Sequence, residues 1–302
     1  ILRAVGVPED RFREDSLRLL RAVRLFATLE FALDPATEAG IAKALDLLHH
    51  VSAERVRVEL VKLLAARQPS LGLRIAERTG VLAVILPELA EMVGVTQNRY
   101  HRYDVWEHTL ATVDATEGDA ICRLGALLHD VAKPLTRTPK TDTSTEGDVE
   151  NSFYNHDALG AKMADDILRR LKFSNEERER VVGVVQHHMF WYSGQWNDAT
   201  VRRFVRRVEP ERLADLFAVR RADVLARGFG EDPERELGPL CARIDKVLGE
   251  AQALSVKDLA IDGQNVMETQ GLAPGRRVGE ILRALLERVI DDPSLNEAAR
   301  RG

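Results

Sequence analysis

The sequence predicts an all-α protein in which a multi-helix body surrounds a central helical domain. Aromatic residues make up only 5% of the 302 residues, whereas Leu, Ala, Arg and Glu recur throughout, a bias that favours helices over strands. Apolar residues also repeat at helical spacing along most of the chain. There is neither an internal repeat nor a sustained heptad pattern, so we expect separate short helices.

The composition indicates a soluble protein of the cytoplasm. With 45% hydrophobic and 30% charged residues, the chain is long enough for two or three packed units. Its net charge of -5 does not indicate nucleic-acid binding by the chain as a whole. Cys122 and Cys241 cannot form a disulfide framework, which favours a reducing compartment. No apolar run reaches the roughly 18–20 residues that cross a bilayer, and no signal peptide opens the chain, so no membrane association is expected.

The N-terminal third is expected to be a series of helices. Pro8, Glu9 and Asp10 place a proline and two acids in the first turn of the first helix. Ser52 is a good N-cap for a later helix, which Pro69 would end. In chain order we expect helices over residues 8–29, 37–48, from 52 onward, 70–80 and 81–93.

A polar and aromatic stretch, residues 97–104, places a boundary near Thr96. From there the helical pattern continues to Gly228, interrupted by a loop over residues 134–155 that contains Thr-Asp-Thr-Ser-Thr-Glu-Gly-Asp. Two further helices are expected over residues 234–253 and 277–290. The expected domain regions are therefore 1–95, 96–228 and 229–302.

Five of the eight histidines, together with two aspartates, follow one another in the middle of the chain like ligands of a metal site. In chain order they are His108, His129-Asp130, His156, His187-His188 and Asp223. Imidazole and carboxylate together suit divalent ions such as Mn, Fe, Ni, Co, Zn or Mg. Several helices could each donate one such ligand to the core of a bundle.

The simpler interpretation of any one of these residues is structural. A single buried histidine is usually a hydrogen-bonded core residue, and a lone His-Asp pair is a weak signal. However, the apolar residues 124–128 would bury His129 and Asp130, which is costly without a cation. The ordered series spans about 115 residues, so we expect a site for one or two divalent cations.

The segment 96–228 resembles the HD superfamily of metal-dependent phosphohydrolases. The resemblance implies a shared metal bound by His108, His129, Asp130 and Asp223. In members that hold two metals, the further ligands match His156 and His187, or its neighbour His188.

The same resemblance implies roles for Asp130 and Lys133 in phosphoester hydrolysis. Bound cations would lower the pKa of a coordinated water and polarise a phosphoryl oxygen. Asp130 would bridge metals or orient the attacking water, and Lys133 would offset charge on the phosphate. Ala132 replaces a glycine that is frequent in the superfamily, which we regard as neutral.

An arginine-rich stretch over residues 11–24 is the second informative feature. Its simplest interpretation is an amphipathic helix whose solvated charges pair at i, i+3 and i+4. Asp15 and Arg18 would then share a face, and a carboxylate beside a guanidinium can read the Watson–Crick edge of a base.

The chain as a whole resembles the bacterial tRNA nucleotidyltransferase and poly(A) polymerase family. The matching segments are Arg3-Ala4-Val5-Gly6, Arg11-Phe12-x-Glu14-Asp15-x-x-Arg18, Leu20-Arg21-Ala22-x-Arg24, residues 52–60, Leu259-Ala260-Ile261-Asp262-Gly263 and Gly271-Leu272-x-Pro274-Gly275. By this resemblance Asp15 and Arg18 would select the base of ATP or CTP, with Glu14 supporting the helix. The body and tail would hold tRNA or another RNA 3′ end.

Nucleotidyl transfer in that family requires a head domain upstream of the neck. No Gly-Ser turn with paired aspartates is found in the sequence, and the chain begins at Ile1 rather than Met. We therefore expect a head domain supplied in cis or in trans, and no CCA or poly(A) addition by this chain alone.

Three functions are compatible with these patterns. The first is a metal-dependent phosphohydrolase for 2′,3′-cyclic or 2′-phosphate ends of RNA or nucleotides. The second is a non-catalytic tRNA-binding body with a vestigial metal site, and the third is a free-standing hydrolase of a small nucleotide. Complete ligand spacing favours the first, and the neck and tail motifs count against the third. The RNA-binding residues are not assigned, because the paired arginines at 202–203, 206–207 and 276–277 are typical of a solvated helix face.

Overall fold

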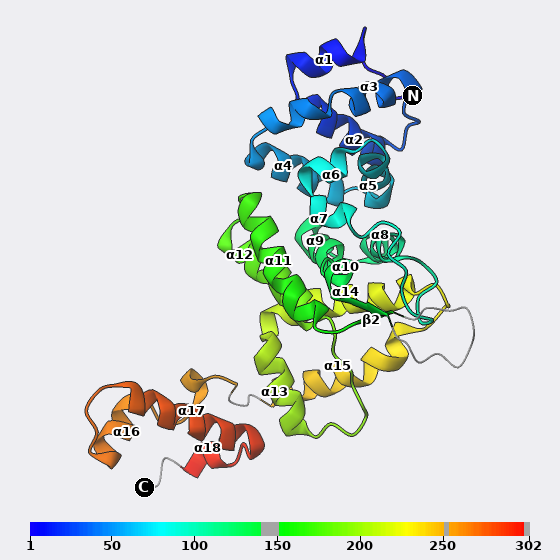
Figure 1. Cartoon of the computed structure of the whole chain (residues 1–302). Coiled ribbons are helices and arrows are strands. Elements are labelled where there is room, and N and C mark those ends of the chain that lie inside the picture. Colours follow the sequence, from blue (N-terminus) through cyan, green and yellow to red (C-terminus); the bar gives the residue numbers. More distant parts are fainter. Residues whose placement is uncertain (140–150, 251–253, 299–302) are drawn as a thin grey trace. The chain divides into compact units, whose positions relative to one another are not determined.

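The computed structural model describes residues 1–139, 151–250 and 254–298, and it confirms the all-α prediction (Figure 1). Within these ranges the strands are two short ones, β1 (Arg137–Pro139) and β2 (Asn151–Phe153), which pair antiparallel. Packing divides the chain into two compact units, one of residues 1–190 and 214–233 and one of residues 191–213 and 234–302. The three regions expected from the sequence are a division by function and remain a prediction.

The first unit is a stack of short helices around one continuous apolar core that extends from Phe12 to Val219. Its helices are α1 (Pro8–Glu14), α2 (Leu17–Leu29), α3 (Pro35–Lys43), η1 (Leu45–His50), α4 (Ala53–Leu64), α5 (Pro69–Arg78), α6 (Val81–Ile85), α7 (Pro87–Ala90), α8 (Val105–Ala115), α9 (Ala120–Leu128), α10 (Lys133–Thr136), α11 (His156–Arg170), α12 (Asn175–His187) and α14 (Leu213–Ala226). Helix α9 packs against α4, α8 and α12, and α11 lies beside α12 (Figure 1). The apolar α9 is therefore central to the half of the unit that holds the His-Asp pair.

The single helix expected over residues 8–29 is wrong, because the chain breaks between α1 and α2. Asp15 adopts an extended conformation (φ -150°, ψ 103°), and its carboxylate accepts a hydrogen bond from the Leu17 amide at 3.1 Å. A short acidic side chain that bonds the backbone two residues ahead competes with helix continuation. The helical periodicity of the flanking residues conceals this break.

Prolines and N-caps explain most of the other helix boundaries. The Ser52 hydroxyl accepts a hydrogen bond from the Arg55 amide, which confirms the expected start of α4. Pro69 lies in the first turn of α5 rather than merely ending α4, since the first turn of a helix needs no proline N–H. Residues 81–93 form two short helices, because Pro87 starts α7 immediately after α6. Likewise, the helix expected over residues 37–48 is α3 followed by η1.

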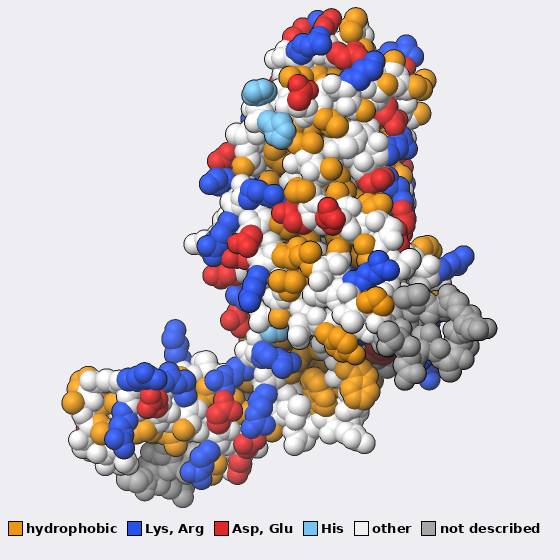
Figure 2. Space-filling view, viewed as in Figure 1, with side chains coloured by type: hydrophobic (Ala, Val, Ile, Leu, Met, Phe, Trp, Pro, Cys, Tyr) orange, Lys and Arg blue, Asp and Glu red, His pale blue; other side chains and the backbone are white. Residues whose placement is uncertain are grey.

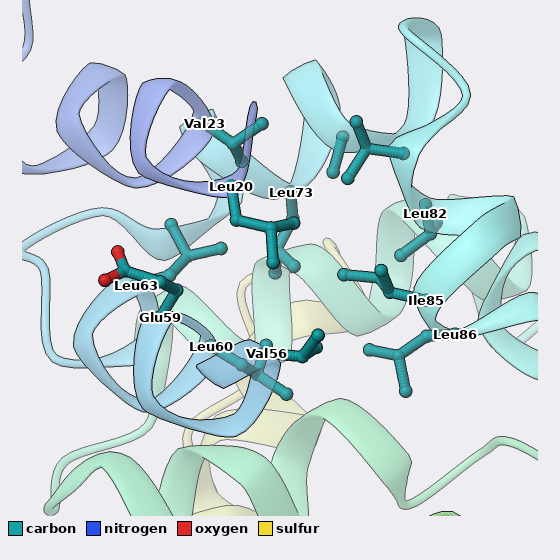
Figure 3. Close-up of a pocket in the computed structure, with 12 residues that line it drawn as sticks. Leu20, Val23, Val56, Glu59, Leu60, Leu63, Leu73, Leu82, Ile85 and Leu86 are labelled. Carbon is teal, nitrogen blue, oxygen red and sulfur yellow. The ribbon is translucent and has the colours of Figure 1, made fainter. Parts of the chain in front are cut away.

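The body of the first unit contains a small cavity lined almost entirely by apolar side chains (Figure 3). The exception is Glu59, whose carboxylate lies at one edge of the lining residues and is directed away from Leu82, Ile85 and Leu86 (Figure 3). Glu59 is only 4% exposed, and it accepts a hydrogen bond from Arg24 at 2.7 Å. This buried ion pair therefore fixes α4 against α2.

The loop expected over residues 134–155 contains regular structure at both ends. Residues 133–136 form α10, and the strands β1 and β2 flank the centre of the loop, with Arg137 opposite Phe153. The Thr-Asp-Thr-Ser-Thr-Glu-Gly-Asp sequence lies outside the described residues.

The second unit contains α13 (Asp198–Val208), η2 (Pro210–Arg212), α15 (Pro233–Gly249), η3 (Val256–Asp258), α16 (Gly263–Gln270), α17 (Arg276–Asp291) and α18 (Leu295–Ala298). The predicted helices over residues 234–253 and 277–290 correspond to α15 and α17; residues 251–253 lie outside the described part. Helix α17 packs against α13 and α16, and the buried Arg202 donates a hydrogen bond to the Ile290 carbonyl at 2.6 Å, near the C-terminal end of α17. In the described ranges, no helix is long and apolar enough to span a bilayer.

Candidate metal centre and neck site

Apart from His187, the predicted metal ligands converge in the first unit, where five different helices carry them or end beside them. The cluster consists of His108 on α8, His129 and Asp130 after α9, His156 at the start of α11, His188 after α12 and Asp223 on α14. Every one of these side chains is buried, with Asp223 the most exposed at 7%. Six ionisable groups at this depth need opposite charge or coordination to be stable.

The four clustered imidazoles are all oriented in the same way by the backbone. In each, Nδ1 contacts a main-chain carbonyl oxygen at hydrogen-bond distance. The pairs are His108 with Ala226 (3.2 Å), His129 with Ala126 (2.7 Å), His156 with Phe153 (2.7 Å) and His188 with Val185 (2.7 Å). A carbonyl only accepts, so Nδ1 carries the proton and donates. In the neutral form of each ring the lone pair then lies on Nε2, the arrangement usual for a metal-ligating histidine.

These lone pairs point at other acceptors within the cluster. His129 Nε2 lies 3.1 Å from Asp130 Oδ2, and it is a buried atom without a hydrogen-bond partner among the described residues. His156 Nε2 lies 3.2 Å from His188 Nε2. Two acceptors at this distance repel unless a cation or a proton lies between them. The donor set of neutral imidazole and carboxylate therefore fits a divalent transition metal ion.

The electrostatics of the cluster keep its aspartates ionised and one histidine neutral. Burial opposes ionisation of Asp130, but His129 and Lys133 outweigh burial and hold the pKa of this carboxyl well below its usual range. Burial likewise opposes ionisation of Asp223, but the His108 hydrogen bond keeps its pKa well below the usual value. Burial, helped by His129, lowers the pKa of His188 to about 3. Ionised carboxylates and a neutral imidazole are the forms that bind metal.

His188, and not His187, lies with the other ligands. His187 is the last residue of α12 and is half-buried, whereas His188 is 2% exposed and contacts His156. Neighbouring residues of a helical turn point in directions about 100° apart, so only one of the pair can face the cluster. The sequence prediction named His187, with His188 as the alternative, and the position of His188 beside His156 corrects that choice.

Most of the cluster lines a pocket of the first unit, and Lys133 is part of the same lining. Its ammonium lies 2.6 Å from Asp130 Oδ2 and donates to Gln97 Oε1 at 2.7 Å. Only 6% of Lys133 is exposed, and its ammonium lies 5.4 Å from the centre of the Phe153 ring. It supplies a positive charge next to the metal ligands, as a phosphate-contacting lysine must.

Other residues that line the pocket were not identified from the sequence. Arg220 pairs with Asp223 at 2.7 Å, and Arg227 approaches the same carboxylate at 3.9 Å. His101 and Tyr100 come from the loop before α8. The arginines follow an i, i+3 and i, i+4 spacing around Asp223, a signal that the sequence contained.

The expected base-reading residues of the neck are present but are paired with other groups. Asp15 Oδ1 accepts a hydrogen bond from Arg55 on α4 at 3.0 Å, and Arg18 donates to Glu14 at 2.8 Å and to the Arg11 carbonyl at 3.1 Å. Burial opposes ionisation of Asp15, but the Leu17 amide and Arg55 lower the pKa of its carboxyl. The Arg18 amide donates to the Asp15 carbonyl at 3.0 Å, so the two residues are adjacent, but each side chain pairs with another residue.

The fold and the site define an all-helical protein with an HD-type metal domain, and family comparisons agree. Residues 88–228 match the HD domain. Residues 30–93 match a domain described as the probable RNA and SrmB-binding site of polymerase A.

The chain belongs to the bacterial tRNA nucleotidyltransferase and poly(A) polymerase family. It is 38% identical to the A-adding tRNA nucleotidyltransferase of Deinococcus radiodurans, over 95% of this chain and 66% of that protein. It is 39% identical to the CC-adding tRNA nucleotidyltransferase of Thermus thermophilus, over 94% of this chain and 64% of that protein. With the multifunctional CCA protein of Xanthomonas campestris it shares 30% identity over 94% of this chain and 70% of that protein. The chain thus spans about two thirds of the length of these relatives.

Solved structures agree on the fold. The Bacillus stearothermophilus CCA-adding enzyme in complex with CTP superimposes with a TM-score of 0.63 and 24% identity, over 96% of this chain and 60% of that chain. A CCA-adding enzyme in apo form I gives a TM-score of 0.52 and 17% identity, over 98% of this chain and 60% of that chain. At these identities the likeness supports the helical architecture alone.

Proposed function

We propose that the HD pocket is a metal-dependent phosphohydrolase within an RNA-processing enzyme of the tRNA nucleotidyltransferase type. Its substrate would be a phosphomonoester or cyclic phosphodiester at an RNA end or on a nucleotide. The observation that carries the proposal is the set of four buried imidazoles, each donating Nδ1–H to a carbonyl and directing Nε2 into the cluster. A purely structural cluster would not need the same tautomer at all four positions.

The ligands divide into two groups that share Asp130. His108, His129 and Asp130 would hold one cation, with Asp223 beside His108 at 3.0 Å. Asp130, His156 and His188 would hold the other. Such ions, when bound, activate water and polarise phosphoryl oxygens.

The chain's own residues then bind and orient the substrate. Lys133 places positive charge beside Asp130 and Arg220 places it beside Asp223, and both charges would attract an anionic phosphoryl group. Asp130 is ionised and can accept a hydrogen bond from the attacking water. Tyr100 and Tyr154 line the pocket and are 58% and 73% exposed, so their rings are available to stack on a base. These features favour a nucleotide or RNA end over a simple phosphate ester.

For the neck we propose selection of ATP or CTP by Asp15 and Arg18, with Glu14 supporting Arg18. The A-adding and CC-adding names of the relatives support this role, as does the backbone hydrogen bond from the Arg18 amide to the Asp15 carbonyl at 3.0 Å, which keeps the two residues adjacent. Nucleotidyl transfer would require a nucleotidyltransferase head domain acting in cis or in trans.

For the tail we propose contact with tRNA through phosphate-binding arginines. Basic side chains gather on the visible face of the second unit (Figure 2), and α17 carries exposed arginines at 276, 277, 283 and 288. Such binding is electrostatic, so the tRNA dissociation constant should rise steeply with salt. A dissociation constant that stays the same between low and high salt would exclude this mode.

The hydrolase proposal is tested with the chain of residues 1–302, a 2′,3′-cyclic nucleotide, a 2′-nucleotide and an RNA that ends in a 2′,3′-cyclic phosphate, with and without added divalent ions. We expect hydrolysis that is lost with a chelator and in Asp130→Ala, and kept in the control His49→Ala, which alters an exposed histidine outside the pocket. Metal binding without hydrolysis of either compound would favour the alternative of a non-catalytic tRNA-binding body. Hydrolysis confined to free nucleotides, with RNA ends untouched, would favour the small-nucleotide hydrolase.

A further inference from the structure

His101 is a fifth histidine that faces the ligand cluster, although it lies in the loop before α8. Its ring stacks edge to face on that of His108, with ring centres 4.9 Å apart at an angle of 89°. One ring nitrogen of His101 groups with ligand atoms of His108 and Asp223, all within 4.8 Å of one another. His101 also lines the pocket.

The tautomer of His101 follows from its neighbours. Its Nδ1 lies 3.0 Å from Asn98 Oδ1, and the same Asn98 atom accepts the Tyr100 amide N–H at 3.1 Å. An atom that accepts an amide N–H must be the side-chain oxygen rather than the nitrogen, so His101 Nδ1 donates its proton to it. In the neutral ring the lone pair of His101 then lies on Nε2, and no hydrogen bond to this atom is found among the described residues.

The loop that carries His101 is held in place from both sides. The His101 amide donates to the Asn98 carbonyl at 3.1 Å, which closes a tight turn. The Arg102 amide donates to the Arg227 carbonyl at 3.1 Å, just after α14, the helix that carries Asp223. The position of His101 is therefore coupled to that of Asp223 and does not depend on a free loop conformation.

We propose that His101 is a metal ligand, and that it completes the coordination of the cation bound between His108 and Asp223. This inference rests on the metal site of the proposed function. The additional imidazole makes this position richer in nitrogen than an ordinary His-Asp pair. Nitrogen ligands favour borderline ions such as Co, Ni and Zn, whereas Mg prefers oxygen. His101 thereby lowers the affinity of the site near His108 for Mg²⁺ relative to its affinity for Co²⁺, Ni²⁺ or Zn²⁺.

The test is metal binding by the full chain, measured by calorimetry with Co²⁺ and with Mg²⁺ and by the visible spectrum of bound Co²⁺. In His101→Ala we expect Co²⁺ at the His108 position to bind at least about 10–100-fold more weakly. Loss of an outer-shell partner already reduces metal affinity by this factor, and loss of a direct ligand should reduce it no less. The Co²⁺ spectrum should change, and the preference for Co²⁺ over Mg²⁺ should shrink. His101→Gln, which keeps most of the size of the side chain, should show the same loss of Co²⁺ affinity as His101→Ala. Asn98→Ala should lower Co²⁺ affinity about 10-fold, because it frees the ring without removing it.

The control variant is His49→Ala, which should bind both ions as the unaltered chain does. Unfolding curves of the metal-free variants show whether each variant is folded, and so separate loss of a ligand from misfolding. If His101→Ala and His101→Gln fold and keep the affinity, the spectrum and the ion preference, the role of His101 as ligand is overturned while the proposed hydrolase stands. If the unaltered chain binds neither ion, both proposals fail.

Discussion

The metal pocket and the neck both bring carboxylates next to basic side chains, but they do so in different environments. In the pocket, Asp130 is 1% exposed and several imidazole nitrogens face it with their lone pairs. In the neck, the Asp15 and Arg18 side chains are 27% and 41% exposed, and each already has an oppositely charged partner. The pocket thus gathers several potential metal-binding atoms within 4.8 Å of one another, whereas the charges of the neck already pair with other side chains. We therefore expect the pocket to bind a cation directly, and a base that enters the neck to displace an existing ion pair.

The largest effect is expected at the aspartate that both ligand groups share. Asp130→Ala should weaken binding of divalent ions more than about 100-fold, because loss even of outer-shell partners reduces metal affinity 10–100-fold. Equilibrium dialysis with Co²⁺ or Mn²⁺ measures this. An Asp130→Ala chain that retained both ions would contradict the shared position of this carboxylate.

Replacing Lys133 should separate binding from hydrolysis. In Lys133→Met the ammonium 2.6 Å from Asp130 Oδ2 is removed, so a competing positive charge disappears and metal affinity should be kept or increase. Hydrolysis should nevertheless slow by about 100-fold, since the charge on the phosphoryl group is less well compensated. Titration of metal and initial rates on the same sample test the two predictions. A fall in both quantities together would mean that Lys133 supports the fold of the site instead.

Acid should release the metal. Although burial lowers the pKa of His129, the neighbouring Asp130 outweighs it and raises this pKa above the usual value of 6.5 in the metal-free protein. As the pH falls through the raised pKa, a proton occupies Nε2 and competes with the ion, so metal affinity should decline as the pH drops. The observable is the Co²⁺ dissociation constant between pH 8 and 5. An affinity that is constant over this interval would show that His129 is not a ligand.

The neck should respond far less to substitution. Arg18→Ala removes an exposed i, i+4 pair with Glu14 and should change the free energy of unfolding by at most about 0.5 kcal/mol. Asp15→Ala removes the group that bonds the Leu17 amide and should cost about 1 kcal/mol. Urea unfolding of both variants measures this difference. Equal losses would show that the turn at Asp15 does not stabilise the junction of α1 and α2.

The ligands could be predicted from the sequence because each is placed by its own local pattern. His129-Asp130 follows the apolar helix α9, and His156 starts α11 and His188 follows α12, each of which buries one apolar face. The choice of His187 over His188 was wrong, because periodicity alone did not decide which of the two neighbours faces the core. His101 could not be predicted in this way. It is placed by the Asn98 turn and by the bond from Arg102 to the Arg227 carbonyl, which joins residues 125 positions apart in the sequence.

The helices were predicted correctly where apolar periodicity is the dominant signal. The prediction failed where a side chain forms a hydrogen bond that competes with the backbone hydrogen bonds of a helix. The end of α1 at Asp15 depends on one hydrogen bond to the Leu17 amide, which no apolar pattern records. Helix α16 was not expected, although its N-cap Asp262 accepts hydrogen bonds from the Gln264 and Asn265 amides. In both cases an aspartate sets the boundary, through a bond only two or three residues long.

The central claim, that the buried imidazoles and carboxylates form a metal site, is tested most directly by counting bound ions. Metal-free chain would be dialysed against Co²⁺ at pH 7.5, beside Asp130→Ala and His49→Ala, and the retained ions determined by elemental analysis. We predict one or two ions per chain for the unaltered protein and for His49→Ala, and none for Asp130→Ala. An unaltered chain that retains no ion would contradict the claim, and so would an Asp130→Ala chain that retains as many as the unaltered one.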